Sequence, residues 1–276
     1  MVFGCCLCDN EVFVHSANAP MNNSANPGVD EGQPRREQAA SFSPLYRQIR
    51  QLLVQALERG DWKPGESIPS EIELAARYQV SQGTVRKAID ELAAEHILIR
   101  RQGKGTFVAT HQEPVVRFRF LRLVPNQGDP VPALSQILWC RKVRATAEMV
   151  RSLDLRAGDS LIYLRRLLSF EGTPTLVDDI YLPATMFDGL SMAVLSANSG
   201  PLYGLFEQRF GVSMVRADEQ LRAVGAPEDV AQLLQVQPGR PILRVDRISC
   251  TYGDRAVELR IGHYLTDQYY YRNALI

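Results

Sequence analysis

The residues between 81 and 87 have side chains suited to contacting DNA. Gln82 can form two hydrogen bonds with an adenine edge, and Thr84 can contact a base edge or a thymine methyl group. Arg86 and Lys87 can neutralise backbone phosphates. If this segment begins a helix, its free N–H groups add an attraction for phosphate. The segment therefore predicts a helix that enters the major groove by its N-terminal end.

A second basic segment, residues 101–105, contains two basic residues and two glycines between β-like runs at 97–100 and 106–108. This pattern predicts a β-hairpin with a basic tip. Such a tip occurs in many hairpins and is weak evidence on its own. Directly after a DNA-contacting helix, it predicts the wing of a winged helix-turn-helix.

The flanking sequence predicts the helices that would hold these residues. Ser43 and Pro44 predict a helix start and Gly60 its end. Ser70 and Glu73 have the spacing of a capping box that opens a second helix. Only two residues separate that helix from Ser81, the expected cap of the third, so the pair predicts a helix-turn-helix. The first helix is expected to bury one face formed by Leu45, Ile49, Leu52, Leu53, Ala56 and Leu57.

The charge of the whole chain does not decide the matter, because 31 basic residues balance 31 acidic ones. Nucleic-acid binding then depends on where the positive residues lie. An alternative is that Arg86 and Lys87 form ion pairs with Asp90 and Glu91 on a solvated helix face. Sequence alone leaves both interpretations open.

Residues 44–108 resemble the DNA-binding domain of the GntR family of regulators. The resemblance rests on Pro44-Leu45-Tyr46, Ile68-Pro69-Ser70-Glu71, Thr84-Val85-Arg86 and Gly103-Lys104-Gly105-Thr106-Phe107-Val108. It implies that residues 82–86 read the major groove and that the wing tip enters the minor groove. The expected DNA contacts are Tyr46, Ser70, Ser81, Gln82, Gly83, Thr84, Arg86, Lys87, Arg101, Gly103, Lys104, Gly105 and Thr106.

Two positions depart from the family pattern. Many relatives carry arginine, which reads guanine, at the positions of Ile72 and Gln82. We therefore expect an operator that differs from the family's common guanine-containing core.

The second half of the chain contains an internal repeat. A helix-like segment at 148–153, a glycine turn at 157–158 and a strand at 161–166 recur at 228–233, 238–239 and 242–247. The repeat predicts two related halves around one antiparallel sheet. Chance similarity of common helix–turn–strand patterns is the alternative.

The segments that carry a second resemblance are residues 166–174, Tyr181-Leu182-Pro183 and Val257-Glu258, with Tyr264 and Asp267. On these segments this half resembles the effector-binding domain of the HutC branch of the GntR family, and the fold of that domain is shared with chorismate lyase. The resemblance implies an α+β domain with an antiparallel sheet and a pocket lined by Arg166, Asp178, Glu258 and Tyr264. Leu168 stands where relatives often hold a second arginine. One arginine fits a small carboxylate better than a phosphosugar. Alternatively, Arg166 simply pairs across strands with Asp178 or Glu258.

The expected organisation is a disordered tail at 1–42, a winged helix-turn-helix at 43–109, a linker at 110–114 and an effector-binding and dimerisation domain at 115–276. The tail contains Cys5, Cys6 and Cys8, which could bind a metal but lack the further ligands of a complete site. Met21 is an alternative start.

We expect a DNA-binding transcriptional regulator, and repression is favoured over activation. It is expected to bind a palindromic operator as a homodimer and to respond to a small effector that bears a carboxylate. No membrane span or secretion signal is visible, so a cytoplasmic location is expected. No nucleophile elbow, P-loop or dinucleotide motif is present, and no cofactor, metal or catalytic activity is expected. A purely architectural DNA-binding protein is the remaining alternative.

Overall fold

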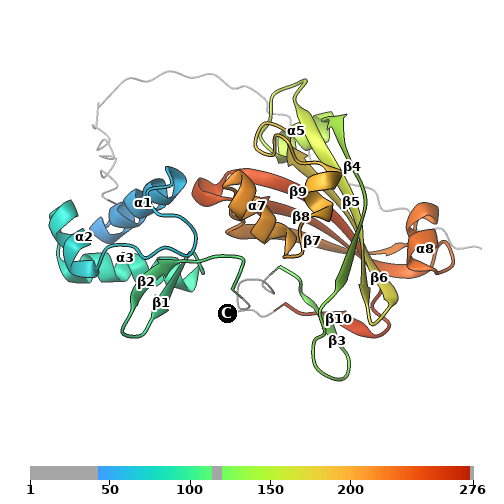
Figure 1. Ribbon diagram of the computed structural model, residues 1–276, viewed down its shortest axis with the longest axis horizontal. Coiled ribbons are helices and arrows are strands. Elements are labelled where there is room, and N and C mark those ends of the chain that lie inside the picture. The colour runs from blue at the N-terminus through green and yellow to red at the C-terminus, as the bar shows by residue number, and fades with distance from the viewer. Residues whose placement is uncertain (1–42, 114–119, 274–276) are drawn as a thin grey trace, which may run out of the picture. The chain divides into compact units, whose positions relative to one another are not determined.

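The structure is a computed structural model that describes residues 43–113 and 120–273 (Figure 1). The expectations for residues 1–42, including the three cysteines there and Met21, lie outside the described residues, as does Pro114 of the expected linker.

The first set of elements is a three-helix unit followed by a two-stranded hairpin. It comprises α1 (Leu45–Glu58), α2 (Glu71–Tyr78), α3 (Gln82–Ala94), β1 (Leu98–Arg101) and β2 (Gly105–Val108). β1 and β2 are antiparallel. The expected helix-turn-helix and wing are therefore confirmed.

Caps define where α2 and α3 begin. Ser70 and Glu73 form the expected capping box, since the Ser70 Oγ accepts from the Glu73 N–H and the Glu73 carboxylate accepts from the Ser70 N–H. The Ser81 Oγ accepts from the Thr84 N–H at 3.1 Å. Gln79 adopts a left-handed conformation, with φ of 54°, which turns the chain sharply between the two helices.

The expectations for α1 were wrong in two details. Its N-cap is Pro44, without a side-chain cap, and not Ser43. Leu45 and Leu52 are exposed, with 58% and 40% of their surface accessible, although the helical pattern placed them on the buried face. The core of this unit is formed by Ile49, Leu53, Leu57, Ile68, Leu74, Val85, Ala88, Ile89, Leu92, Ile97, Leu98 and Val108.

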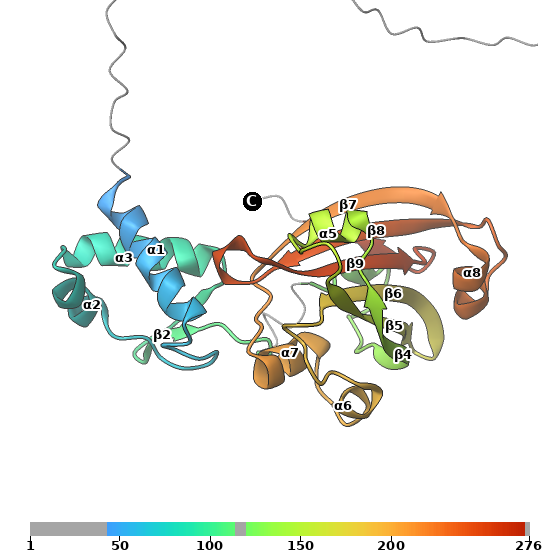
Figure 2. The ribbon, with the colours of Figure 1, turned by 90° about the horizontal axis from the view of Figure 1, so that it is seen from above.

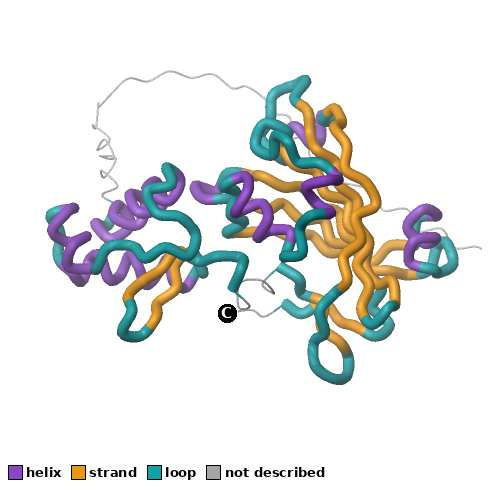
Figure 3. Tube along the Cα trace, in the orientation of Figure 1, coloured by secondary structure: helices purple, strands orange, loops and turns teal. Residues whose placement is uncertain are grey.

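The second set of elements is built on a six-stranded antiparallel sheet in the order β4-β5-β6-β9-β8-β7. Figure 3 shows the strands in orange and the helices in purple. Its strands are β4 (Leu134–Arg144), β5 (Ser160–Phe170), β6 (Thr173–Pro183), β7 (Arg216–Gly225), β8 (Pro241–Cys250) and β9 (Ala256–Tyr264). A separate two-stranded sheet pairs β3 (Leu123–Pro125) with β10 (Tyr269–Tyr271). The helical segments are α5 (Ala147–Ser152), α6 (Met192–Ser196), α7 (Leu202–Phe210), α8 (Glu228–Leu234) and the 3-10 turn η1 (Tyr252–Asp254).

The strand order agrees with the two halves that the repeat predicted. In each half an edge strand is followed by a short helix and then by a hairpin: β4, α5, β5 and β6 in one half, β7, α8, β8 and β9 in the other. The two halves meet where β6 pairs with β9. A site on the central strands can therefore draw side chains from both halves.

The two faces of the sheet are covered by different helices (Figure 2). Leu195 of α6 and Phe206 of α7 pack in one apolar cluster with Leu164 and Ile180 of the sheet. On the other face, α8 packs against Leu167 and Val177, the neighbours of cavity-lining residues along their strands. Within residues 43–113 and 120–273, no helix is both long and apolar enough to cross a membrane.

Candidate nucleic-acid interface and effector cavity

The N-terminal turn of α3 presents polar side chains at the surface. Gln82, Arg86 and Lys87 are exposed and Thr84 is half-buried, whereas the intervening Val85 is fully buried. The alternation follows from the helical period, because the apolar residue anchors α3 and turns its neighbours outward. Gly83 is also exposed. The expected major-groove residues therefore share one exposed helix end.

The wing turns on glycines. Gly103 and Gly105 have φ of 70° and 108°, conformations that residues with a Cβ rarely adopt. The exposed Lys104 lies between them at the tip. Arg101 is more restrained, since its guanidinium lies 4.3 Å from the Phe107 ring centre and pairs with Glu113.

A groove of about 570 Å³ joins the start of α2 to the wing. It brings together the expected DNA contacts Ser70, Gln82, Arg101, Gly103, Lys104, Gly105 and Thr106, together with Ile72. Tyr46 is not part of this groove, and its ring lies 4.0 Å from the Lys87 ammonium.

Arg86 does not form the ion pairs of the alternative interpretation. Its Nε donates to the Glu71 carboxylate at 2.9 Å, across to α2, while Asp90 pairs with Arg100. Sequence reasoning missed Glu71 as a member of this surface. The signal for Glu71 was its place directly after the Ser70 cap, because this makes it the first residue of α2, beside the expected DNA contact Ser70.

The second candidate site is a cavity of about 440 Å³ on the α7 face of the sheet. Of the four expected effector contacts, Arg166, Asp178 and Tyr264 line it, and Glu258 does not. Arg260 and Tyr203 also line it and were not expected. The apolar part of the lining includes Phe120, Leu121, Pro132, Ala133, Ile137, Leu168 and Leu176.

Asp178 is fully buried between two arginines. Its Oδ2 accepts from Arg166, at 2.9 Å from Nε and 2.7 Å from Nη2, and from the Arg260 Nη1 at 3.2 Å. Burial alone would raise the pKa of this carboxyl, but the charges of Arg260 and Arg166 more than offset burial and lower it. Its Oδ1 is buried and has no hydrogen-bond partner among the described residues. The alternative in which Arg166 pairs with Asp178 is therefore observed, and it leaves one buried oxygen unsatisfied.

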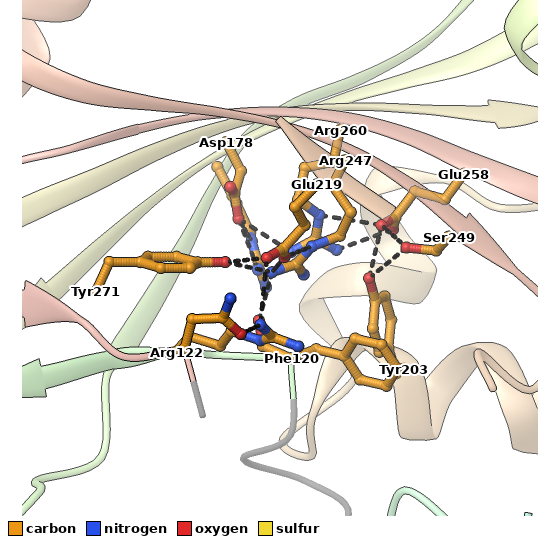
Figure 4. Close-up of polar contacts among 12 residues, drawn as sticks. Phe120, Arg122, Asp178, Tyr203, Glu219, Arg247, Ser249, Glu258, Arg260 and Tyr271 are labelled. Carbon is orange, nitrogen blue, oxygen red and sulfur yellow. Dashed lines mark hydrogen bonds and ion pairs between the residues drawn. The ribbon is translucent and has the colours of Figure 1, made fainter. Parts of the chain in front are cut away.

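Glu258 is not part of the cavity lining, and it holds Arg260 in place (Figure 4). Its Oε1 accepts from the Arg260 Nε at 3.1 Å and its Oε2 from Nη2 at 2.8 Å. Tyr203 and Ser249 also donate to Oε1, at 2.6 and 3.0 Å. Both oxygens of this carboxylate thus accept hydrogen bonds from protein groups, so Glu258 supports Arg260 and is not free to bind an effector.

Tyr264 is buried at the end of β9, and burial raises the pKa of its phenol. Gly262 leaves room for the ring, since a Cβ there would come within 2.5 Å of it. Arg260 could have been found from the strand period, which places it on the same face as Glu258 and Tyr264. Tyr203 carried no comparable signal, because only the packing of α7 brings it to the sheet.

A third contact set connects α7 to the expected linker. The Glu207 carboxylate is buried and accepts from the Thr110 hydroxyl and from the His111 N–H, the latter at 3.2 Å. His111 is buried, lines the cavity, and donates from Nε2 to the Met214 carbonyl at 3.0 Å. Tyr203 and Glu207 are four residues apart on α7, so one helix contacts both the cavity and the linker.

Among the described residues, no group of three His, Cys, Asp or Glu side chains is arranged to hold a metal ion. Cys250 is buried, and Cys140 is half-buried.

Comparison with known proteins gives two family matches that together span most of the described residues. Residues 45–108 match the bacterial regulatory protein gntR family, and residues 133–270 match the UTRA domain. The expected boundary between the two sets of elements lies between these matches.

Individual relatives agree with these matches. The chain is 31% identical over 222 residues to an HTH-type transcriptional regulator of Mycobacterium tuberculosis, covering 79% of each chain. It is 29% identical over 211 residues to the histidine utilization repressor of Pseudomonas putida, covering 74% of this chain and 82% of the relative.

A solved structure is similar over the second set of elements. The structure described as the ligand-binding domain of a GntR-family regulator from Bordetella bronchiseptica is 58% identical, with a TM-score of 0.56, and covers 57% of this chain and 98% of its own. The relatives are transcriptional regulators and not enzymes. The chain belongs to the GntR family of bacterial DNA-binding transcriptional regulators and carries a UTRA domain for a small-molecule effector.

Proposed function

We propose that this regulator is a cytoplasmic repressor that binds a palindromic operator as a homodimer and releases it when a small metabolite occupies the cavity beside Arg166 and Asp178. One observation supports this proposal most directly. Both halves of the sheet contribute polar side chains to the cavity, and α7, which also lines the cavity, is hydrogen-bonded to the linker through Glu207. Relatives that are named as repressors support the direction of regulation.

The polar lining favours an effector that bears both a carboxylate and a hydrogen-bond donor. The Arg166 Nη1 has no partner among the described residues and can donate to a carboxylate. The unsatisfied Oδ1 of Asp178 needs a donor, because a buried acceptor without one is destabilising. An amino or hydroxy acid supplies both groups.

The charge balance argues against a phosphorylated effector. Arg166 and Arg260 are matched by Asp178 and Glu258 within the same network. Leu168, on the cavity wall, adds no further cation. A phosphate dianion would bring two negative charges into this balanced network, whereas a hydroxy acid brings one and an amino acid has no net charge, so the dianion is the least favourable in a partly buried site.

The contacts of α7 supply a route from the cavity to the DNA-binding elements. The Tyr203 ring lies 5.3 Å from the His111 ring and 5.2 Å from the Phe120 ring, and both of these residues line the cavity. An effector that displaces these rings would alter the hydrogen bonds that Glu207 accepts from Thr110 and His111. A tenfold loss of operator affinity requires about 1.4 kcal/mol of coupling.

A homodimer is proposed because one recognition helix reads only a half-site. Two copies related by a two-fold axis place two such helices on a palindrome. The expected DNA contacts of α3 and the wing would read each half-site, with Gln82 setting the preference at one position. Replacing Gln82 with arginine should change that preference towards guanine.

Two assays with the full chain test the proposal. Binding-site selection from random duplexes should recover a palindrome. A thermal-shift screen should show stabilisation by amino or hydroxy acids, less by simple carboxylates without a donor, and none by phosphosugars. A non-palindromic consensus would contradict the dimer, and stabilisation by phosphosugars alone would contradict the effector class.

Matched variants assign the effector to the cavity. Arg166→Lys keeps the charge but removes the planar fork, so the thermal shift should fall strongly. Arg141→Lys, on the exposed part of β4, should leave it unchanged. Equal shifts in both variants would place the binding site elsewhere.

A further inference from the structure

Glu71 brings a negative charge into the surface that faces DNA. It is the first residue of α2, it lines the groove between α2 and the wing, and its side chain is 14% exposed. Phosphates repel a carboxylate, so the charge of Glu71 by itself lowers the affinity of this surface for DNA. Its contacts with neighbouring side chains indicate what it contributes in return.

The carboxylate contacts three side chains of the same surface. Its Oε2 accepts from the Gln82 Nε2 at 3.2 Å and from the Arg86 Nε at 2.9 Å. Its Oε1 accepts from the Arg100 Nη1 at 2.9 Å. Glu71 therefore links α2 to the reading end of α3 and to the wing strand β1.

Glu71 is itself held in place. The Ser70–Glu73 capping box fixes the first turn of α2 around it. Arg100 is fixed from a second side, since its Nη2 donates to Asp90 of α3 at 2.6 Å. Glu71, Arg86, Arg100 and Asp90 thus form one network of ion pairs. This network orients Arg86 in the absence of DNA.

The contact with Gln82 also sets the orientation of its amide. A glutamine reads adenine by donating one N–H to N7 and accepting from N6 with its oxygen. The side-chain nitrogen carries two hydrogens, so one can bond Glu71 while the other remains for adenine. With the nitrogen directed to Glu71, the amide is kept from flipping, and both reading groups stay in a defined order.

We propose that Glu71 is a positioning residue for sequence discrimination: it orients Gln82 and Arg86 for reading bases and reduces the attraction of this surface to DNA of any sequence. Discrimination rises because the oriented side chains fit one sequence, whereas the repulsion between the carboxylate and phosphates lowers the affinity for every sequence alike. This role goes beyond the proposed operator binding and rests only on the chain's DNA-binding surface.

Glu73 provides a matched control for the test. Glu71→Gln and Glu73→Gln remove the same charge from the same turn of α2, and glutamine at 73 retains a capping box. Of the two glutamates, Glu71 contacts Gln82, Arg86 and Arg100, whereas the carboxylate of Glu73 accepts from Ser70. The dissociation constant of each full-length variant is measured for the duplex selected by the unmodified chain and for a scrambled duplex of equal length and composition.

Both variants should bind the scrambled duplex more tightly, by similar factors. Glu71→Gln should lower the ratio of scrambled to selected dissociation constants by about tenfold, in the range of one lost base contact, and Glu73→Gln should leave it near the unmodified value. Glu71→Asp, which keeps the charge but is shorter, should lower the ratio without tightening scrambled binding.

Equal ratios for Glu71→Gln and Glu73→Gln would overturn the proposal, as would unchanged discrimination in Glu71→Asp. If Glu71→Gln unfolds, Glu71→Asp carries the test.

Discussion

At the scale of single residues, Asp178 and Asp179 are neighbours on β6 with opposite electrostatic environments. Asp178 faces the cavity between Arg166 and Arg260, and the pKa of its carboxyl is lowered because those charges outweigh burial. Asp179 lies on the other face, and burial raises its pKa although Tyr163 donates to it. Adjacent positions in one strand thus differ in what ionisation contributes to stability.

Asp178→Asn should destabilise the protein by about 3–5 kcal/mol at pH 7, because it leaves buried arginine charge without its partner. A lowered folded-state pKa contributes stability above the unfolded value, and this contribution is lost as pH falls through the folded value. The difference between parent and variant in urea unfolding should therefore shrink below about pH 4. Asp179→Asn is the control and should cost less at pH 7. Equal losses for the two variants would contradict this account of the cavity.

At the scale of elements, the wing depends on a left-handed backbone conformation that glycine adopts without strain and that other residues adopt rarely. Gly103 has φ of 70°, and no atom lies within 4 Å of the position its Cβ would occupy. A substitution there is thus penalised by the backbone conformation and not by crowding. The fit of the wing tip to DNA depends on the same turn.

Gly103→Ala should destabilise the wing by about 1–2 kcal/mol, the energy of a left-handed conformation for a residue with a Cβ. Operator affinity should fall in parallel, because the hairpin no longer holds Lys104 at its tip. Gln102→Ala, at an exposed neighbouring position, should change stability by less than about 0.5 kcal/mol. Urea unfolding and operator titration measure both effects, and identical behaviour of the two variants would exclude a role for the turn conformation.

Local patterns predicted these elements well. The caps at Ser70 and Ser81, the glycines of the wing and the repeat around each hairpin depend on interactions between near neighbours in sequence. The exposed faces of Leu45 and Leu52 were not predicted, since the period of a helix does not reveal how wide a stripe its partners cover. Tyr203 and Arg260 meet Asp178 only through strand pairing and helix packing between distant segments.

At the scale of the whole molecule, Glu207 connects the effector domain to the segment that leads to the wing. Burial raises the pKa of this carboxyl, and hydrogen bonds from Thr110, His111 and Ser213 offset that only in part. A raised folded-state pKa means that the favourable contribution is present below the unfolded value near 4.5 and is lost as pH rises through the folded value. At neutral pH the ionised carboxylate of Glu207 is therefore buried at a cost to the stability of the folded protein.

Glu207→Gln should be more stable than the parent at pH 7, since the amide can still accept from the His111 N–H and donate to the Thr110 hydroxyl. The advantage should disappear as pH falls towards 4.5. Denaturation midpoints across this range check the prediction, with Asp129→Asn on an exposed loop as the control. A difference that does not vary with pH would show that the charge of Glu207 is not its cause.

The central claim is that occupancy of the cavity controls DNA affinity, and one titration tests it directly. The dissociation constant of the full chain for its selected palindrome is measured against increasing concentrations of the compound that gives the largest thermal shift. The account predicts a rise of about tenfold or more, with a midpoint that matches the compound's own binding. A compound that binds and stabilises the protein while operator affinity stays constant would contradict it.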